Sequence, residues 1–114
     1  MISKDLLKGT LKTIVLKLLE ENGRMYGYEI TKRVEKLSKG NVQLTWGALY
    51  PTLHKLEADG LIVAEEVKSG KRVRKYYKLT QSGNQTSILK IEDFIEYVNT
   101  MKDLLKLRPD FQMV

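Results

Sequence analysis

The stretch from Thr45 to Ile62 constrains the fold of this chain most strongly. Leu49, Leu53 and Leu56 recur at spacings of four and three residues, a pattern that predicts a helix with one buried side. Thr45 is suited to cap the start of that helix, and Gly60 can adopt the left-handed conformation that ends it. The rest of the chain must therefore provide an apolar surface against which this helix packs.

The opposite side of this helix is rich in hydrogen-bonding groups and small residues: Thr45, Gly47, Ala48, Tyr50, Thr52, His54 and Lys55. Such a side suits insertion into the major groove of DNA, although an ordinary surface helix explains this stretch alone equally well. Pro51 removes one backbone donor and presses on the carbonyl of Gly47. The helix is therefore predicted to be irregular or to start only near Gly47.

The positive charge of the chain is concentrated in one short segment. The whole chain carries a formal net charge of +6. Residues 61–80 contribute +4 of this, because Glu65 and Glu66 are opposed there by six basic residues: Lys68, Lys71, Arg72, Arg74, Lys75 and Lys78. A local basic excess is typical of a surface that binds a polyanion, and a solvated charged hairpin is the plainer alternative.

Two further helices are predicted before residue 45. The first spans Asp5 to Glu21, and its apolar positions at helical spacing include Leu7 and Leu11. The second opens at Tyr26, ends at Ser38-Lys39-Gly40, and turns three apolar side chains inward: Ile30, Val34 and Leu37.

A two-stranded hairpin is predicted after Gly60. Residues 61–68 begin with the strand-favouring run Leu-Ile-Val, and residues 72–79 alternate, which places Tyr76 and Tyr77 on opposite faces. Ser69-Gly70, between the two segments, fits a two-residue turn.

The last predicted element is a helix too long for the rest of the chain to cover. Thr80 is suited to cap its start, and a helix from Ser82 to Leu107 would be about 39 Å long. Five of its apolar residues repeat at alternating spacings of three and four, the pattern of a two-helix seam: Ile91, Phe94, Val98, Met101 and Leu105. We therefore predict a homodimer joined by this helix, with Leu7 and Leu11 of the first helix contributing to the interface.

The order of these elements predicts the fold. Three helices, a basic hairpin and one long helix form the plan of a winged helix-turn-helix, a mainly α (α+β) fold with a two-stranded β wing and a long C-terminal dimerisation helix. Residues 1–80 are predicted to form the DNA-binding domain, residues 81–108 the dimerisation helix, and residues 109–114 a tail that frays.

The sequence also resembles the PadR-type transcriptional regulators, and the shorter subgroup in particular. The segments that carry the resemblance lie between residues 6 and 83: Gly27-Tyr28-Glu29-Ile30, Leu49-Tyr50-Pro51-Thr52-Leu53-His54-Lys55-Leu56-Glu57 with Asp59-Gly60-Leu61-Ile62, and Lys75-Tyr76-Tyr77-Lys78-Leu79-Thr80 with Gly83. The resemblance implies a homodimeric regulator, usually a repressor, of a near-palindromic operator in double-stranded DNA. It implies that the third helix enters the major groove, that the wing contacts the adjacent backbone or minor groove, and that the last helix forms the dimer.

The resemblance also raises the question of a small-molecule effector at the dimer interface. Some members of the shorter subgroup bind flat aromatic drugs between the subunits through a Trp on the last helix. In this chain the only Trp is Trp46, which is predicted to be partly buried, and the last helix has Phe94 and Tyr97 instead. An effector is left open, and no cofactor is predicted.

Candidate DNA-contacting residues come from the second helix, the third helix and the wing. Tyr28 could touch a phosphate or pack in the core. Tyr50 could reach a phosphate or a base edge while the leucines anchor its helix, or it could close the edge of the core. The other candidates, each of which could instead be solvated, are Thr45, Ala48, Thr52, His54, Lys55, Lys71, Arg72 and Arg74.

Other functions fit the composition poorly. The chain has no Cys and one His, which removes most catalytic triads and metal clusters, so neither an enzyme nor a metal site is predicted. No apolar run is long enough to span a bilayer, so no membrane partner and a cytoplasmic location are expected. The alternative function is a dimeric winged-helix module that binds other proteins and does not read DNA. A wing that is basic rather than acidic favours DNA.

Overall fold

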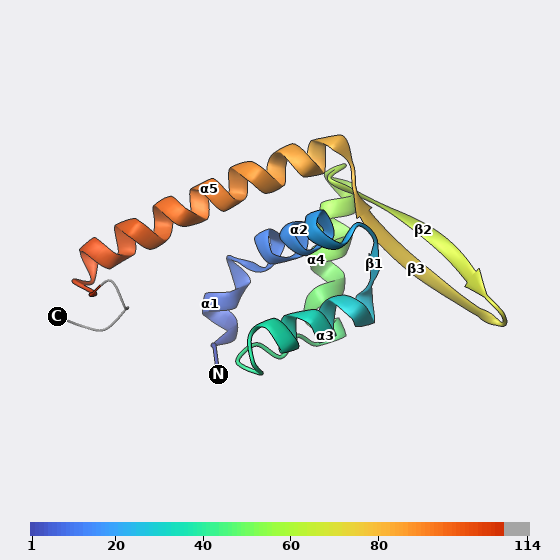
Figure 1. The fold of residues 1–114 in the computed structure, drawn as a ribbon, viewed down its shortest axis with the longest axis horizontal. Coiled ribbons are helices and arrows are strands. Elements are labelled where there is room, and N and C mark those ends of the chain that lie inside the picture. The colour runs from blue at the N-terminus through green and yellow to red at the C-terminus, as the bar shows by residue number, and fades with distance from the viewer. Residues whose placement is uncertain (109–114) are drawn as a thin grey trace.

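The computed structural model describes residues 1–108, and the predicted tail at 109–114 lies outside the described residues. The elements of the described part follow one another in this order (Figure 1): α1 (Lys4–Lys8), α2 (Leu11–Asn22), β1 (Met25–Tyr26), α3 (Gly27–Leu37), α4 (Trp46–Ala58), β2 (Ile62–Ser69), β3 (Arg72–Leu79) and α5 (Gln81–Leu104). This is the predicted winged helix-turn-helix: α3 and α4 form the helix pair, and β2 with β3 forms the wing.

The single first helix predicted over 5–21 is wrong. The chain turns at Gly9 and Thr10, between α1 and α2, and the N–H of Thr10 donates to the carbonyl of Leu7 at 2.9 Å, which closes a tight turn of four residues. Glycine is a poor residue in a helix interior because it loses the most backbone freedom there. Gly9 therefore lowers the helix propensity at this point, which the apolar repeat on either side of it conceals.

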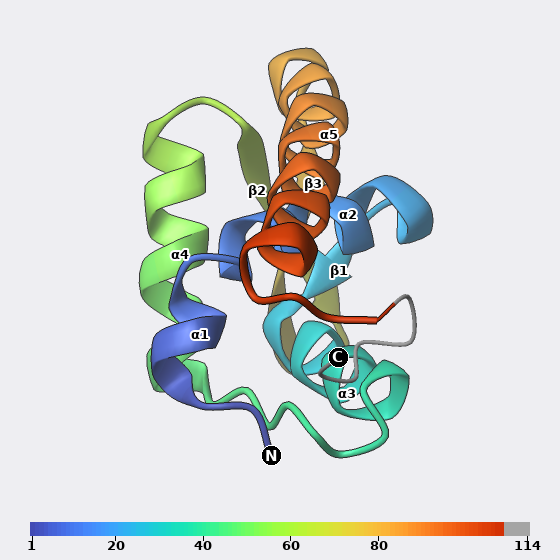
Figure 2. The same ribbon diagram turned by 90° about the vertical axis from the view of Figure 1, so that its left-hand side faces the viewer.

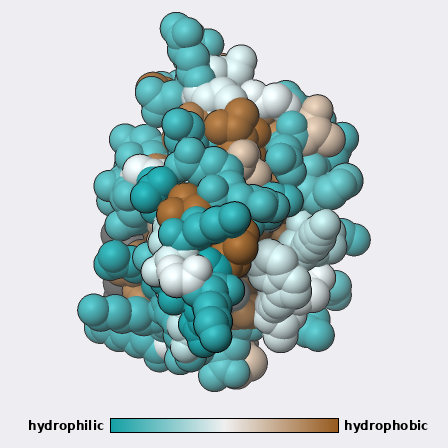
Figure 3. All heavy atoms as spheres, turned by 90° about the vertical axis from the view of Figure 1, so that its right-hand side faces the viewer, coloured by the Kyte–Doolittle hydropathy of each residue, from teal (hydrophilic) through white to brown (hydrophobic). Residues whose placement is uncertain are grey.

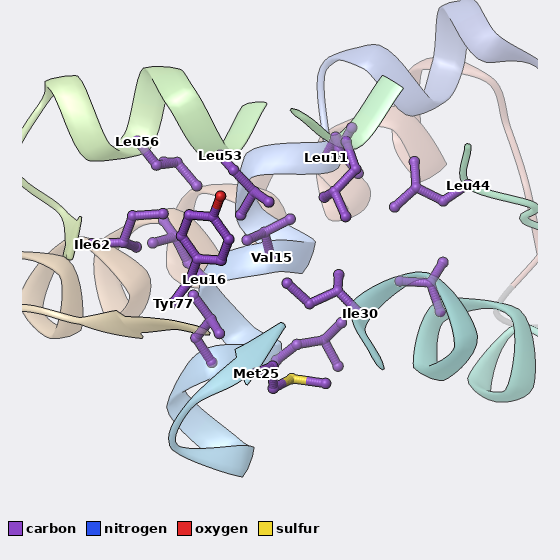
Figure 4. Packing of buried hydrophobic residues seen from close by; sticks show 14 of the residues in the cluster. Leu11, Val15, Leu16, Met25, Ile30, Leu44, Leu53, Leu56, Ile62 and Tyr77 are labelled. Carbon is purple, nitrogen blue, oxygen red and sulfur yellow. The ribbon is translucent and has the colours of Figure 1, made fainter. Parts of the chain in front are cut away.

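The hydrophobic core lies where α2, α3 and α4 meet the inner face of the sheet (Figure 4). Leu49, Leu53 and Leu56 of α4 are at most 1% exposed, which confirms the predicted buried side of this helix. Ile62 and Tyr77 of the hairpin point into the same cluster, so the base of the wing is part of the core.

One residue predicted to face this core does not. Leu37 is 63% exposed, whereas Val42 and Leu44 are buried. α3 ends at Leu37, and the extended segment that follows brings Val42 and Leu44 back over the core in its place. A helical repeat indicates which side of a helix is apolar, but it does not show where the covering elements stop.

α4 begins and ends as predicted. The hydroxyl of Thr45 accepts the N–H of Ala48 at 3.2 Å, and Gly60 has φ +75°. The helix starts at Trp46, beside Gly47, and continues through Pro51 without a break, although Pro51 lies beyond the first turn and leaves the carbonyl of Gly47 without its helical donor. A Pro in a helix costs roughly 3 kcal/mol, whereas burial of each leucine contributes about 1.5–3 kcal/mol, so three buried leucines keep the helix intact.

The sheet has a third strand that was not predicted. Its order is β1-β3-β2, all antiparallel, and β1 pairs with β3 through Met25↔Tyr77 and Tyr26↔Tyr76. A two-residue strand is held by its partner rather than by its own sequence, so no local pattern indicates it. As predicted, Tyr76 and Tyr77 face opposite ways: Tyr77 is buried, and Tyr76 stacks edge-on with Tyr26 on the outer face.

The turn of the hairpin lies one residue later than predicted. Ser69 pairs with Arg72, so the two turn residues are Gly70 and Lys71. Gly70 has φ +63°, and Lys71 does not share this left-handed conformation. A positive φ at the first turn position alone is typical of a type II′ turn, which matches the twist of the strands.

α5 begins as predicted but ends earlier. The hydroxyl of Thr80 accepts the N–H of Gly83 at 3.0 Å, which caps the start. At the other end Lys106 has φ +54°, and the N–H of Leu107 donates to the carbonyl of Lys102 at 2.9 Å. This left-handed ending closes the helix at Leu104, before the Arg-Pro pair that was expected to stop it.

α5 runs over α2 and projects beyond it, away from the hairpin (Figures 1 and 2). Its 24 residues make a helix about 36 Å long. Only Gly83 and Ser87, both near its start, are buried. Most of the helix therefore has no covering element within the described part of the chain.

Candidate nucleic-acid interface

The residues of α4 that point away from the core form two separate strips. Side chains three or four residues apart share a side of a helix. Tyr50 and His54 lie on one side of the buried leucines, toward the hairpin, and Ala48, Thr52 and Lys55 lie on the other side. The predicted contact residues of α4 therefore form two groups rather than one cluster. A DNA groove that received this helix would be contacted on both of its walls.

The first strip is a ladder of aromatic rings. The rings of Trp46 and Tyr50 are stacked, with centroids 5.3 Å apart and planes at 9°, and the ring of His54 meets Tyr50 edge-on at 6.1 Å. Tyr50 is 40% exposed, so part of its side chain is accessible although its ring is held. Trp46 is 52% exposed, so it is partly buried, as predicted: its ring is covered on one side by Tyr50 and by the start of α3.

The second strip is polar and less ordered by contacts. Ala48 and Lys55 are exposed and Thr52 is half-buried. The ammonium group of Lys55 lies 3.2 Å from the carboxylate of Asp59, and both side chains are well exposed. An exposed pair of this kind contributes little to stability, so Lys55 can exchange Asp59 for another anion at small cost.

The basic residues of the hairpin differ in how firmly they are held. Lys71 and Arg72 are exposed at the tip. Arg74 is half-buried, and its guanidinium lies 4.5 Å from the ring centre of Tyr26. The sequence placed these three cations together, whereas the structure separates a freely solvated tip from an arginine already packed on an aromatic ring.

A second arginine packs on the outer face of the sheet. Arg24 lies 4.7 Å from the ring centre of Tyr76, and its guanidinium donates to the carboxylate of Glu65 at 2.7 Å. This hydrogen bond holds the pKa of Glu65 below its usual range. Arg24, which lies outside the hairpin, thus neutralises one of the two acidic residues of the hairpin. The basic residues of the wing are therefore opposed by less negative charge.

A cavity of about 720 Å³ connects the base of the hairpin to the start of α4. Its lining includes aromatic and basic side chains from four elements, β1, α3, α4 and β3: Tyr26, Tyr28, Trp46, Tyr50, Arg74 and Lys75. Tyr28, a predicted contact, is exposed at its rim, with the ammonium group of Lys32 5.4 Å from its ring centre. The face from which the hairpin projects is otherwise mainly hydrophilic (Figure 3).

Tyr26, Trp46 and Lys75 were missed as members of this surface. The spacing of four between Trp46 and Tyr50 was a usable signal, because it places both rings on one side of a helix. Tyr26 and Lys75 join the surface only through the pairing of β1 with β3, which local sequence does not reveal. Behind the cavity, burial raises the pKa of the Tyr77 hydroxyl, so this tyrosine stays neutral beside Lys75.

The other predicted surface lies on α5 and the helices below it. Phe94 is 38% and Leu105 58% exposed; Ile91, Val98, Met101 and Leu7 are half-buried. Leu11 is different: at 6% exposure it belongs to the core of the monomer and offers a partner almost no surface. A cavity of about 670 Å³ opens between these elements, lined in part by Leu6, Leu7, Ile14, Phe94 and Tyr97.

Two further observations concern the described residues, 1–108. No group of three or more histidine and acidic side chains among them is placed to hold a metal ion. None of their helices is both long and apolar enough to cross a membrane.

Comparisons with known proteins identify what this arrangement resembles. Residues 15–87 match the model of the transcriptional regulator PadR-like family. The transcriptional regulator YqjI of Escherichia coli is 33% identical over 100 residues, which cover 88% of this chain and 44% of YqjI. This chain therefore corresponds to less than half the length of that relative.

Solved structures agree with the sequence comparison. A transcriptional regulator from Clostridium thermocellum superposes with a TM-score of 0.82 at 29% identity, covering 90% of this chain and 97% of the other. PadR of Bacillus subtilis, solved in complex with operator DNA, superposes with a TM-score of 0.63 at 30% identity, covering 71% of this chain and 46% of PadR. The fold, the matched residues and these relatives together show that the chain belongs to the PadR-like family of transcriptional regulators.

Proposed function

We propose that this chain is a homodimeric repressor that reads a near-palindromic site in double-stranded DNA. The observation that carries the proposal is the exposed side of α4. Its aromatic and hydrogen-bonding groups are not needed by the core, and they lie beside a hairpin segment that supplies +4 of the net charge of +6. Membership of the family and the operator complex of the B. subtilis neighbour support the proposal.

In this proposal α4 enters the major groove and the hairpin holds the flanking phosphates. Tyr50 and Lys55, on opposite sides of α4, are the residues we assign to base edges or to the nearest phosphates. Lys71 and Arg72 at the exposed tip are assigned to phosphates, because long basic side chains gain affinity by releasing counterions. Contacts with base edges give specificity, and contacts with phosphates give affinity on any sequence.

The dimer is proposed from the uncovered side of α5. Phe94, Val98 and Met101 share one side of this helix, and the cavity beside Leu7 leaves room for apolar groups of a second copy. Two identical subunits related by a twofold axis read two inverted half-sites, hence the near-palindrome. The rings of Phe94 and Tyr97, 6.0 Å apart, are the aromatic groups that α5 could offer to a small-molecule effector at this interface.

Repression is the mode of regulation we propose, because occupancy of a promoter by such a dimer is enough to exclude polymerase. No catalytic step is part of the proposal. A reporter gene placed behind the bound sequence should be transcribed less when the protein is supplied. A rise in reporter expression would make the protein an activator.

The experiment that tests DNA reading is selection of bound sequences from random duplex DNA, followed by titration of the selected site and a shuffled duplex. Tyr50→Phe and Lys55→Ala should each weaken binding to the selected site, and a residue that reads a base should cost about 1–3 kcal/mol on that site only. Because Lys55 pairs with Asp59, Asp59→Asn is the matched control, and its effect should be small.

Equal losses on both duplexes would reassign the residue to the DNA backbone. If no sequence is selected, and the protein binds neither duplex at moderate salt, DNA reading is refuted. The function would then be the alternative one, a dimeric winged-helix module that binds other proteins.

A further inference from the structure

We propose that Trp46 is a positioning residue that holds the ring of Tyr50 in the orientation in which α4 meets DNA. The proposal rests on the proposed function and adds a residue that no contact prediction included. It also assigns a reason for Gly27, the first residue of α3. Three observations carry it: the stacked rings, the contact of Trp46 with Gly27, and the exposure of Tyr50.

The first observation is the geometry of the stack. Trp46 and Tyr50 are nearly parallel, at 9°, with centroids 5.3 Å apart, an offset arrangement that aromatic pairs favour. The indole covers one face of the phenol ring, and His54 closes its edge. Tyr50 thus has a ring on each side of it along the helix, while 40% of the residue remains exposed.

The second observation is that Trp46 is itself seated on another helix. A Cβ added at Gly27 would collide with the ring of Trp46, whose atoms are the three nearest to that position. Only a glycine leaves room for the indole ring at the start of α3. Gly27 does not have a positive φ, so its backbone does not require glycine, and the requirement comes from the ring of Trp46.

The seat of Trp46 is connected to the wing. The ring of Tyr26, which precedes Gly27, lies 4.5 Å from the guanidinium of Arg74 and 5.3 Å from the ring of Tyr76. The wing, the start of α3 and the start of α4 are therefore joined through the side chains of Tyr26 and Trp46 and the backbone of Gly27. Tyr50 is oriented with respect to the wing and not only to its own helix.

Ordering Tyr50 before binding has a measurable consequence. An exposed side chain that is free to rotate must be immobilised when DNA binds, and that entropy is subtracted from the affinity. A ring held in advance by Trp46 avoids the loss. Trp46→Ala should therefore weaken binding to the selected site about threefold to tenfold, the range set by the interaction of one aromatic pair.

A double-mutant cycle separates positioning from direct contact. If Trp46 acts through Tyr50, Trp46→Ala weakens binding in the wild-type background and has almost no further effect in the Tyr50→Ala background. Trp46→Phe, which keeps a ring over Tyr50, should restore most of the affinity. Leu37→Ala, which removes another exposed apolar side chain on the helix pair, is the control and should change nothing.

A second experiment tests the contact of Trp46 with Gly27 by fluorescence, alongside DNA binding. Trp46 is the only Trp, so the fluorescence of the protein reports its surroundings alone. Gly27→Ala should displace the indole into water, shift its emission to longer wavelength, and lower affinity for the selected site as much as Trp46→Ala does. Gly9→Ala is the matched control, since an added Cβ there meets nothing within 4 Å and should leave the emission unchanged.

The two mutations should not add. Once residue 46 is alanine, the ring that collides with a side chain at residue 27 is gone. The double variant Gly27→Ala with Trp46→Ala should therefore bind the selected site as the single Trp46→Ala variant does.

The outcomes that would overturn the inference are distinct from those that refute DNA reading. Wild-type protein that binds the selected site, with additive losses from Trp46→Ala and Tyr50→Ala, would make Trp46 an independent DNA contact. Unchanged emission in Gly27→Ala would show that the indole does not depend on this seat. Wild-type protein that binds no DNA refutes the proposed function, and with it the role of Trp46.

Discussion

α4 and α5 carry the same kind of apolar repeat, but these residues are buried in α4 and remain accessible in α5. Leu49, Leu53 and Leu56 of α4 are covered almost completely by the rest of the monomer. On α5 the corresponding residues remain accessible, most of all Phe94 and Leu105. A periodic stripe thus indicates which side of a helix avoids water, but not which molecule provides the cover.

The difference follows from position in the chain. α4 lies between elements that return to it on both sides, namely α2, α3 and the base of the hairpin. α5 has contact with α2 and with β3 near its start and then projects past them. If a second subunit covers α5, the two helices should respond differently to loss of an apolar side chain: α4 in stability, α5 in assembly.

The largest effect is expected on α4. Leu53→Ala should lower the free energy of unfolding by about 2–5 kcal/mol, because the side chain is fully buried and leaves a cavity. Chemical denaturation measures this loss. His54→Ala, at the exposed neighbouring position, is the control and should stay within about 0.5 kcal/mol. A comparable loss in both variants would mean that the leucine stripe is not the core of the fold.

A smaller effect, of a different kind, is expected on α5. Phe94→Ala should weaken dimerisation by about 1–2 kcal/mol, because only the remaining accessible part of the ring, taken twice, is available to a partner. Sedimentation over a range of concentrations would show more monomer, with the helix content unchanged. Glu92→Gln, at an exposed position of the same helix, should leave the equilibrium as it is. A wild-type protein that is purely monomeric at micromolar concentration would contradict the interface altogether.

The wing should respond in affinity for DNA rather than in stability or assembly. Arg72→Ala should weaken binding to the selected and the shuffled duplex alike, and lower the salt slope of log affinity by roughly 0.9 for each phosphate that is no longer neutralised. Arg74→Ala should also disturb Tyr26, on which Arg74 packs, so its effect should be larger on the selected site. Lys8→Ala, which removes an equal charge from α1 at the far end of the molecule, is the control. An unchanged slope in Arg72→Ala would mean that the tip is only solvated.

The smallest effect is expected at the ion pair on the outer face of the sheet. The carboxylate of Glu65 is stabilised by Arg24, so its pKa is lower in the folded than in the unfolded protein. The stabilisation is therefore present above the usual pKa of a glutamate and is lost as pH falls through the lowered value. Glu65→Gln should melt slightly below wild type at neutral pH, and the gap should close in strong acid. A gap that widens in acid would contradict this assignment.

The same contrast shows what sequence can and cannot supply. Thr45, Gly60 and Thr80 were predicted as helix ends because capping and left-handed glycine act over a few residues. The break at Gly9 was missed because an apolar repeat on both sides of a turn resembles one helix. The end of α5 was missed because Lys106 adopts a conformation that sequence assigns to glycine.

The candidate site was predictable to the same extent. Tyr50, Lys55 and the basic tip were visible because each depends on a local pattern. The seat of Trp46 was not, since it requires two helix starts, 27 and 46, to lie against each other. Contacts between distant segments decide which exposed residues form one surface, and a single sequence does not display them.

The junction between α4 and α5 has a consequence for the length of the DNA site. The Thr80 hydroxyl donates to the Gly60 carbonyl at 2.7 Å, the Thr80 N–H donates to the Leu61 carbonyl at 3.1 Å, and a Cβ at Gly83 would collide with that same carbonyl. The start of α5 is thus fixed against the end of α4. In a dimer joined through α5, the angle between α4 and α5 sets the distance between the two copies of α4. That distance in turn sets how many base pairs separate the half-sites. A bulkier residue at position 83 would therefore change the number of base pairs between the half-sites. The preferred DNA sites would keep the same bases within each half-site and differ in the separation of the half-sites.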